Sequence, residues 1–234
     1  LTDLKNISFQ VRVGEIYGIA GVAGNGQSEL MDILTGENIN IKSGSINFDN
    51  KNIEKYGPQK RRDLSISFVP ENRLGHSAVP ELSLSDNILL SQFPKNNFIK
   101  NGIILKNNVD DFANNVIKEF NVITPGNDAK ASSLSGGNLQ KYVIGREISS
   151  KPKILIISHP TWGIDAGAEH SIRESLIDLS KNGTSIIVIS QDLDELIEIT
   201  HQISVIYDGN LSNPLKTSEV EIEKLGLLMG GKNE

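Results

Sequence analysis

The chain has 234 residues, with 23 Lys and Arg against 29 Asp and Glu, a net charge of −6, and no cysteine. The charge balance argues against a nucleic-acid surface, and the missing cysteines exclude a disulfide framework and thiolate-bound metal. No apolar run approaches the ~20 residues that a membrane helix needs, and no basic segment leads into an apolar one as in a signal peptide.

The start of the chain predicts a domain cut from a longer protein. It opens at Leu1 instead of methionine and reaches strand-like sequence almost at once. The four histidines are scattered and show no metal-ligand spacing.

The first seventy residues predict strands on both sides of a glycine-rich loop. Leu4–Val13 alternates apolar and polar side chains, which is typical of a strand with one wet face. Ile16–Ala20 is a short apolar run of the kind buried in a parallel sheet, and Gly21–Ser28 (GVAGNGQS) follows it directly. Three more elements are expected: a helix carrying Leu30, Ile33 and Leu34 that ends at Gly36, a strand and turn over Gly44–Ile53 antiparallel to the first strand, and a buried strand over Ser65–Val69.

Roughly residues 75–133 predict a helical lobe inserted in the α/β core. Leu82–Leu90 forms a first helix with Ser85 as its N-cap, and loops are expected between Pro94 and Asn108. A second helix has an apolar stripe, which indicates core packing and not a ligand site. The stripe consists of Val109, Phe112, Ala113, Val116, Ile117 and Phe120.

The remaining sequence predicts strands alternating with helices, the pattern of an α/β layer structure. The expected elements are a helix over Leu139–Ser149, a strand over Lys153–Ile157, a helix with Ile172, Leu176 and Leu179, a strand over Ser185–Ile189, a helix over Leu193–Thr200, and a strand over Ile203–Tyr207 with a hairpin turn at Asp208-Gly209-Asn210.

The loop GVAGNGQS has the frame of a phosphate-binding loop without its cation. In GxxxxGK[ST] loops, backbone N–H groups cradle polyphosphate, the lysine reaches the terminal phosphates, and the hydroxyl holds Mg²⁺. Here Gly21, Gly26 and Ser28 match, and Gln27 takes the place of the lysine. The loop alone leaves two alternatives, a nucleotide site that lost a part or an unrelated glycine turn.

The segment Leu134–Asn138 (LSGGN) resembles the signature of the ATP-binding-cassette (ABC) ATPases. The order of motifs agrees along the whole chain, from the phosphate loop through LSGGN to Gly163-Ile164-Asp165. The closer similarity is to the second, C-terminal cassette of the tandem ATPases of simple-sugar (ribose-type) and nucleoside importers. Three strings carry it: GIAGVAGNGQSEL, FVPENRLGHSAVPELSLSDNILL and LSGGNLQK. GVAGNGQ favours the nucleoside branch.

This resemblance implies a P-loop NTPase of the ABC-cassette fold over residues 1–234, with a mixed core sheet, an N-terminal antiparallel β part and the helical lobe. In that family two cassettes pack head to tail, so each ATP lies between the phosphate loop of one and the signature of the other. The implied ATP-binding residues are Gly21, Gly24, Asn25, Gly26, Gln27, Ser28 and Glu29 in the loop, and Leu134, Ser135, Gly136, Gly137 and Asn138 in the signature.

The resemblance also implies ATP and Mg²⁺ as cofactors. The implied partners are a first cassette in the same chain, membrane permease subunits and, indirectly, a solute-binding protein, with no nucleic acid. The protein would then be cytoplasmic and peripheral on the inner face of the cell membrane. The transported solute is not implied, because its specificity lies in other subunits.

This sequence departs from the family at the charged positions of its own phosphate site. Ser158 and His159 replace the Asp-Glu pair that anchors Mg²⁺ and activates water, and Gln191 replaces the switch histidine. Glu71 replaces the loop glutamine that senses Mg²⁺. We therefore expect weak Mg²⁺ binding at Ser28, Glu71 and Ser158. We expect a working ATP site only where LSGGN of this chain completes the phosphate loop of the partner cassette.

Two alternatives remain at this point. The domain is an active, unconventional ATPase that uses His159 as its base, or it is a regulatory ABC module outside transport, in translation or DNA maintenance.

Overall fold

The computed structural model describes residues 2–93 and 97–232. The chain divides into two units: unit 1 comprises Leu1–Phe68, Lys153–His159 and Leu176–Glu234, and unit 2 comprises Val69–Pro152 and Pro160–Ser175. Within the described ranges, no helix is both long enough and apolar enough to cross a membrane.

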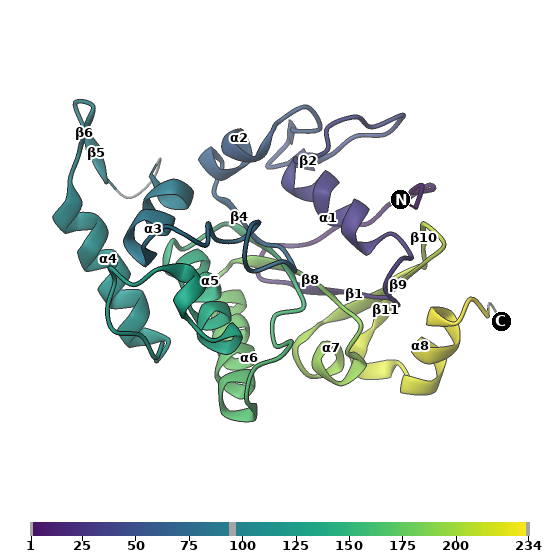
Figure 1. The fold of residues 1–234 in the computed structure, drawn as a ribbon. Helices are drawn as coiled ribbons and strands as arrows, with labels where there is room; N and C mark the ends of the chain where they lie inside the picture. The colour runs from purple at the N-terminus through teal and green to yellow at the C-terminus, as the bar shows by residue number, and fades with distance from the viewer. Residues whose placement is uncertain (1, 94–96, 233–234) are drawn as a thin grey trace. The chain divides into compact units, whose positions relative to one another are not determined.

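A seven-stranded sheet, ordered β10-β9-β1-β8-β7-β4 with β11 beside β9, forms the centre of unit 1 (Figure 1). β1, β7, β8 and β9 run parallel, and the short β10 and β11 are antiparallel to β9. The inner strands are apolar and buried along almost their whole length, as expected for a sheet covered on both faces. The bounds are β1 Ile16–Ala20, β4 Ile66–Val69, β7 Ile154–Ser158, β8 Ser185–Ser190, β9 Gln202–Tyr207, β10 Asn210–Leu211 and β11 Leu215–Lys216.

The predicted core strands are therefore confirmed to within one or two residues. So are the helices of unit 1 near residues 30 and 195, which are α1 (Gln27–Thr35) and α7 (Leu193–Ile199). Gly36 ends α1 in the left-handed conformation with φ 83°, as its position predicted. Two further helices of this unit, α2 (Pro58–Asp63) and α8 (Ile222–Met229), were not predicted.

The prediction of a strand over Leu4–Val13 was wrong. This stretch forms no strand, although Leu4, Ile7, Phe9 and Val11 are partly buried against the core of unit 1. Val13, the last residue of the expected pattern, is 84% exposed. Alternation reports which side of the chain is buried, and it does not report whether the backbone has a pairing partner. Asn6 also adopts φ 53°, which interrupts an extended backbone.

The strand and turn over Gly44–Ile53 is a separate hairpin, β2 (Asn47–Phe48) and β3 (Lys51–Asn52). Its turn residues Asp49 and Asn50 have φ 48° and 61°, as in a type I′ turn. The predicted antiparallel pairing of this segment with Leu4–Val13 was therefore also wrong, and the antiparallel part near the N-terminus consists of this hairpin.

Unit 2 is mainly helical and contains α3 (Leu84–Gln92), α4 (Lys106–Glu119) and α5 (Gly136–Ser149). The apolar stripe of α4 is confirmed as core, since Val109, Ala113, Val116 and Phe120 are buried. The last predicted helix of this region is α6 (Ala166–Lys181), which contributes residues to both units.

Two details of unit 2 differ from the prediction. The N-cap of α3 is Ser83, whose hydroxyl accepts a hydrogen bond from the Asp86 N–H at 3.0 Å, while Ser85 lies inside the helix and donates to Asp110. The stretch predicted as loops contains the hairpin β5 (Ile99–Lys100) and β6 (Ile103–Ile104), which is too short for a periodic signal. Residues 94–96 of that stretch lie outside the described residues.

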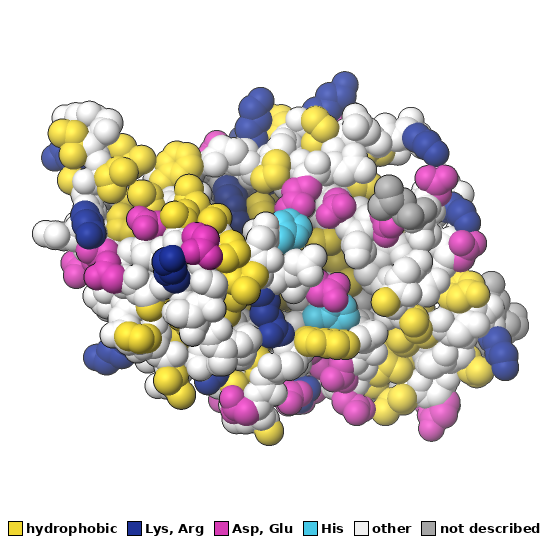
Figure 2. All heavy atoms as spheres, in the orientation of Figure 1, with side chains coloured by type: hydrophobic (Ala, Val, Ile, Leu, Met, Phe, Trp, Pro, Cys, Tyr) yellow, Lys and Arg dark blue, Asp and Glu magenta, His cyan; other side chains and the backbone are white. Residues whose placement is uncertain are grey.

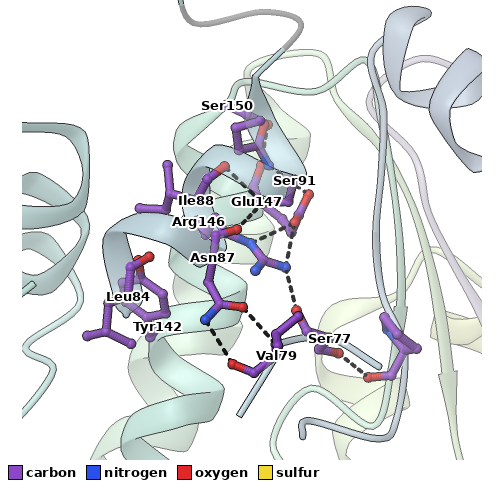
Figure 3. Close-up of polar contacts among 12 residues, drawn as sticks. Ser77, Val79, Leu84, Asn87, Ile88, Ser91, Tyr142, Arg146, Glu147 and Ser150 are labelled. Carbon is purple, nitrogen blue, oxygen red and sulfur yellow. Dashed lines mark hydrogen bonds and ion pairs between the residues drawn. The ribbon is translucent and has the colours of Figure 1, made fainter. Parts of the chain in front are cut away.

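A buried ion pair within α5 lies beside the segment that follows β4 in unit 2, and its arginine bonds that segment (Figure 3). Arg146 and Glu147 are 2% and 0% exposed, with 2.9 Å between guanidinium and carboxylate. Arg146 also donates to the Ser77 carbonyl at 3.0 Å, and Gln92 donates to Glu147 at 3.1 Å. Asn87 adds further contacts to the same segment by bonding both backbone groups of Val79. The Arg146–Ser77 bond thus holds the segment 70–79 on the helix that carries the signature, and the Asn87 bonds hold it on α3.

Candidate functional site

The carboxyl ends of three neighbouring parallel strands of unit 1 meet at one edge of the sheet. Ala20 lies opposite Ser190, and Ser158 lies opposite Ile189. The loop after β1, the residue Gln191 after β8, and Ser158-His159 at the end of β7 are therefore brought together. The His159 N–H donates to the Ile189 carbonyl at 2.8 Å, which fixes the end of β7 beside β8. Ligands of open α/β sheets bind at such an edge.

The glycines of the loop are required by its geometry. Gly24 and Gly26 have φ 88° and 114°, a conformation that side chains disfavour. A Cβ at Gly21 would stand 2.6 Å from the Gln27 amide nitrogen and 2.9 Å from the Ile206 carbonyl oxygen. The loop leads directly into α1, whose start has no side-chain cap, so its first N–H groups have no side-chain acceptor. This is the backbone frame of a phosphate cradle.

The side chain at the lysine position is folded back onto its own loop. Gln27 is 8% exposed, and its amide oxygen accepts a hydrogen bond from the Asn25 N–H at 3.3 Å. Its amide nitrogen lies against Gly21. The position therefore supplies an uncharged group that bonds one of the loop's own N–H groups.

The loop is anchored by residues that the sequence did not point to. The Asn25 side chain accepts from the Asp208 N–H at 3.0 Å, and its carbonyl accepts from the Gly209 N–H at 3.0 Å. Thr2 donates its hydroxyl to the Gly24 carbonyl and its N–H to Glu29, both at 2.8 Å. The turn Asp208-Gly209 was visible in the sequence, but no local signal placed it against the phosphate loop.

Helix α1 is held from its other end by a fully buried arginine. Arg61 donates to the carbonyls of Ile33 and Leu34 at the C-terminal end of α1, at 2.7 and 2.5 Å. It also donates to the carbonyls of Tyr56 and Ile53. Burial lowers the pKa of Arg61 to about 10, so it remains charged at neutral pH. Both ends of the helix that follows the loop are thus fixed within unit 1.

The edge of the sheet where the loop Gly21–Ser28, Ser158-His159 and Gln191 meet, here called the loop edge, fits Mg²⁺ poorly. Ser28 is exposed at the start of α1, Ser158 is buried at the end of β7, and neither carries a negative charge. The carboxylate of Glu29 is bonded to Thr2. In the part of the chain that the structure describes, no three His, Asp or Glu side chains gather where they could hold a metal. Mg²⁺ prefers anionic oxygen ligands, which this edge does not supply.

The predicted site residues Gln191 and His159 belong to unit 1, and Glu71 belongs to unit 2. Gln191 is half-buried and is followed by the N-cap Asp192, whose N–H donates to Ser190 at 3.1 Å. His159 is half-buried with φ 47°. Glu71 is exposed and belongs to unit 2.

The signature segment forms the start of α5 in unit 2. Ser135 is its N-cap and accepts hydrogen bonds from the Asn138 N–H at 3.4 Å and from the Asn138 side chain at 2.9 Å. The Asn138 oxygen in turn accepts from the Ile123 N–H at 2.9 Å. Gly136 and Gly137 are the first two helical residues, and the first turn of this 14-residue helix has no acidic side chain. The helix therefore presents a positive end suited to an anion.

Asp165 lies between β7 and α6 and directly precedes α6. Its carboxylate accepts from the Ala168 N–H at 3.0 Å, and this bond is the main cause that lowers the Asp165 pKa below 3.8. A lowered folded-state pKa means that the bond stabilises fully above the unfolded pKa and is lost as the pH falls through the folded one. We expect Asp165→Asn, which keeps a cap without a titrating group, to lose less thermal stability between pH 7 and pH 3 than the unmodified protein. Equal losses measured by calorimetry would contradict this.

Comparison with known proteins agrees with this geometry. The family model described as ABC transporter matches residues 4–162. The chain is 40% identical to the nucleoside import ATP-binding protein NupA of Lactococcus lactis over 98% of this chain and 45% of NupA. It is 36% identical to the guanosine import ATP-binding protein NupO of Bacillus subtilis over 100% of this chain and 46% of NupO. It is 35% identical to the ribose import ATP-binding protein RbsA of Lactococcus lactis over 98% of this chain and 46% of RbsA. The chain thus spans less than half the length of these relatives.

The fold is that of solved ABC cassettes. The cassette MJ0796, determined as a dimer in a post-hydrolysis state with ADP and phosphate, superposes with a TM-score of 0.79, at 23% identity, over 92% of this chain and 90% of that one. The predicted cassette architecture, a P-loop α/β core with a mixed, mainly parallel central sheet and a helical lobe, is thereby confirmed. The chain belongs to the ABC transporter family, as an ATP-binding domain homologous to nucleoside and ribose import ATPases.

Proposed function

We propose that this chain is the ATP-binding cassette of a nucleoside or simple-sugar importer in which its LSGGN segment completes the ATP site of a partner cassette. Its own phosphate loop binds nucleotide weakly. The observation that carries the proposal is the contrast between two anion sites: the start of α5 is open and positive, whereas the loop edge has lost its charged groups at Gln27, Ser158 and Gln191.

In this proposal the signature acts on nucleotide that the partner holds. The N–H groups of Gly136 and Gly137 and the Ser135 hydroxyl bind the terminal phosphate, and the end of α5 stabilises the charge that develops when water attacks it. The partner's own loop supplies the lysine and the Mg²⁺ ligands. The chain is then one part of an ATPase coupled to transport, with little activity of its own.

The remaining parts of its own site support binding without fast hydrolysis. The glycine cradle and Ser28 are present, but a neutral amide at Gln27 forgoes on the order of 1–2 kcal/mol relative to a charged donor, or roughly tenfold in affinity. The absence of a carboxylate at Ser158 and at His159 leaves Mg²⁺ and the attacking water without their usual partners. Such a site serves assembly or regulation.

The partners follow from the relatives. Their length, more than twice the matched segment, leaves room for a second cassette in the same protein. That this chain is the C-terminal of the two is proposed from the strings GIAGVAGNGQSEL and LSGGNLQK alone. We place the protein on the inner face of the cell membrane, where the relatives' import function requires permease subunits. The 40% identity to NupA, against 35% and 38% to the ribose import proteins of Lactococcus lactis and Clostridium tetani, favours a nucleoside as solute.

An exposed apolar patch on unit 2 is the proposed contact with the permease. Figure 2 shows hydrophobic side chains gathered over α3 and the β5–β6 hairpin. Ile103 and Ile104 are 67% and 53% exposed, and Leu90 is 55% exposed. Phe93 and Ile99 belong to the same group. A cytoplasmic loop of the membrane subunit with an apolar face would cover these side chains.

Titration of the purified chain with Mg·ATP tests the weak site. We expect weak or undetectable heat in calorimetry, and Gln27→Lys should raise the affinity about tenfold by restoring a charged donor. Gln10→Lys adds the same charge at an exposed position outside the loop and should leave binding unchanged. Micromolar, Mg²⁺-dependent binding by the unmodified chain would contradict the proposal. Phosphate release that His159→Ala abolishes would establish the active-ATPase alternative instead.

A further inference from the structure

The guanidinium of Arg73 lies beside the start of the signature helix. Its Nη1 stands 3.0 Å from the position that a Cβ on Gly136 would take, and its Nη2 stands 3.7 Å from that of Gly163. Nη2 also donates a hydrogen bond to the Trp162 carbonyl. All four residues belong to unit 2. The side chain therefore sits between the first turn of α5 and the Trp162-Gly163 turn.

This cation has no anionic partner among the residues that the structure describes. Its one hydrogen bond goes to a neutral carbonyl, although a guanidinium has five N–H groups to donate. It is half-buried, and burial lowers its pKa. The adjacent turn of α5 is a second positive centre with no acidic residue. Two positive groups held together at a partly exposed surface are an arrangement that an anion stabilises.

The backbone of Arg73 is held in place relative to α5. The Ala78 N–H donates to the Arg73 carbonyl at 2.8 Å, and the Ser77 N–H donates to the Asn72 carbonyl at 3.0 Å. The Ser77 carbonyl accepts from Arg146 of α5 at 3.0 Å, as Figure 3 shows. The segment that carries Arg73 is thus bonded to the same helix whose N-terminus it faces, so the guanidinium is pre-positioned and its donors cost little to order.

We propose that Arg73 is a phosphate-binding residue of the signature face, and that it donates to the terminal phosphate of a nucleoside triphosphate presented by the partner cassette. The inference rests on the proposed function of LSGGN and adds to it a charged group from a different segment. Bidentate contact between a guanidinium and phosphate oxygens suits the planar fork of arginine, and lysine would replace it only in part.

The test is the steady-state ATPase activity of the full-length gene product with its permease. We expect Arg73→Gln to raise KM for ATP about tenfold or more, with inhibition by ADP unchanged, because ADP lacks the terminal phosphate. Arg73→Lys should give an intermediate KM. Lys118→Gln, which removes one exposed charge from α4, should leave KM unchanged.

Each other outcome counts against the inference in a defined way. If Arg73→Gln behaves like Lys118→Gln, or weakens ATP and ADP alike together with a lower melting temperature, Arg73 only supports the Trp162-Gly163 turn. If Arg73→Gln does not fold, Arg73→Lys becomes the test. A KM for ATP equal to that of the unmodified protein would then show that Arg73 does not bind the phosphate. If Gly137→Asp also leaves the ATPase activity intact, the proposed role of the signature itself fails. If Gly137→Asp abolishes activity and Arg73→Gln has no effect, only the proposed role of Arg73 fails.

Discussion

Replacing Glu147 with alanine is expected to lower the free energy of unfolding by about 3–5 kcal/mol, because it leaves the buried Arg146 without its charge partner. Arg146 and Glu147 are 2% and 0% exposed, so water cannot take over the lost contact. Urea unfolding followed by circular dichroism measures the change. The fluorescence of Trp162, the single tryptophan, reports on unit 2 in the same experiment.

Two variants separate the buried charge from simple loss of packing. Glu81→Ala removes one partner of the exposed Lys130–Glu81 pair, at 2.8 Å, and should cost at most about 1 kcal/mol. The double change Arg146→Met with Glu147→Leu replaces both charges by apolar groups and should recover much of the stability. A Glu147→Ala protein as stable as Glu81→Ala would show that the buried Arg146–Glu147 pair does not stabilise the fold.

Gly137→Asp is expected to reduce the ATPase activity of the full-length gene product with its permease by about 100-fold or more. The change places a negative charge in the first turn of α5, where the proposal puts the terminal phosphate of the partner's ATP. The position has room for a side chain, since a Cβ there would lie 3.6 Å from the nearest atom, of Ile164. The loss should therefore come from charge, with the melting temperature little changed.

Gly226→Asp is the matched control, because it makes the same substitution in α8 at a glycine with open space around it. It should leave activity unchanged. Gln27→Ala should also have a small effect, within about threefold, since the proposed working site uses the partner's loop. Loss of activity with Gln27→Ala and not with Gly137→Asp would reverse the proposed roles of the two segments.

The elements that could be predicted were those with a strong local signal. Ile16–Ala20 and Ser185–Ile189 are apolar without interruption, and they form β1 and β8 as expected. Gly36 ends α1 because few other residues adopt its φ of 83°. The same reasoning failed at Leu4–Val13, where four of the ten side chains are partly buried against the core but the backbone forms no strand. It also failed at Ser83, because two serines near one helix start satisfy the same capping pattern.

The identities of the residues at the loop edge were predicted, but their hydrogen bonds and packing were not. Gln27 was recognisable as a substitution for lysine, yet only the tertiary structure shows its amide bonded to Asn25 and lying against Gly21. Arg73 was part of a quoted motif with no assigned role. Its place beside Gly136 depends on the fold of segment 70–79 onto α5, through contacts such as Arg146 with Ser77 that join residues 69 positions apart.

The sequence by itself determined the order of the core strands and of the main helices, the family, and the residues that stand at the phosphate loop and the signature, because periodicity, glycines and motif order are local properties. The tertiary structure alone decided which strand ends meet, that Thr2 and Asp208 anchor the loop, and that an arginine with no counterion among the described residues faces the signature. Those contacts join residues far apart in the chain, and no local pattern specifies them, since each is selected by the packing of the whole unit.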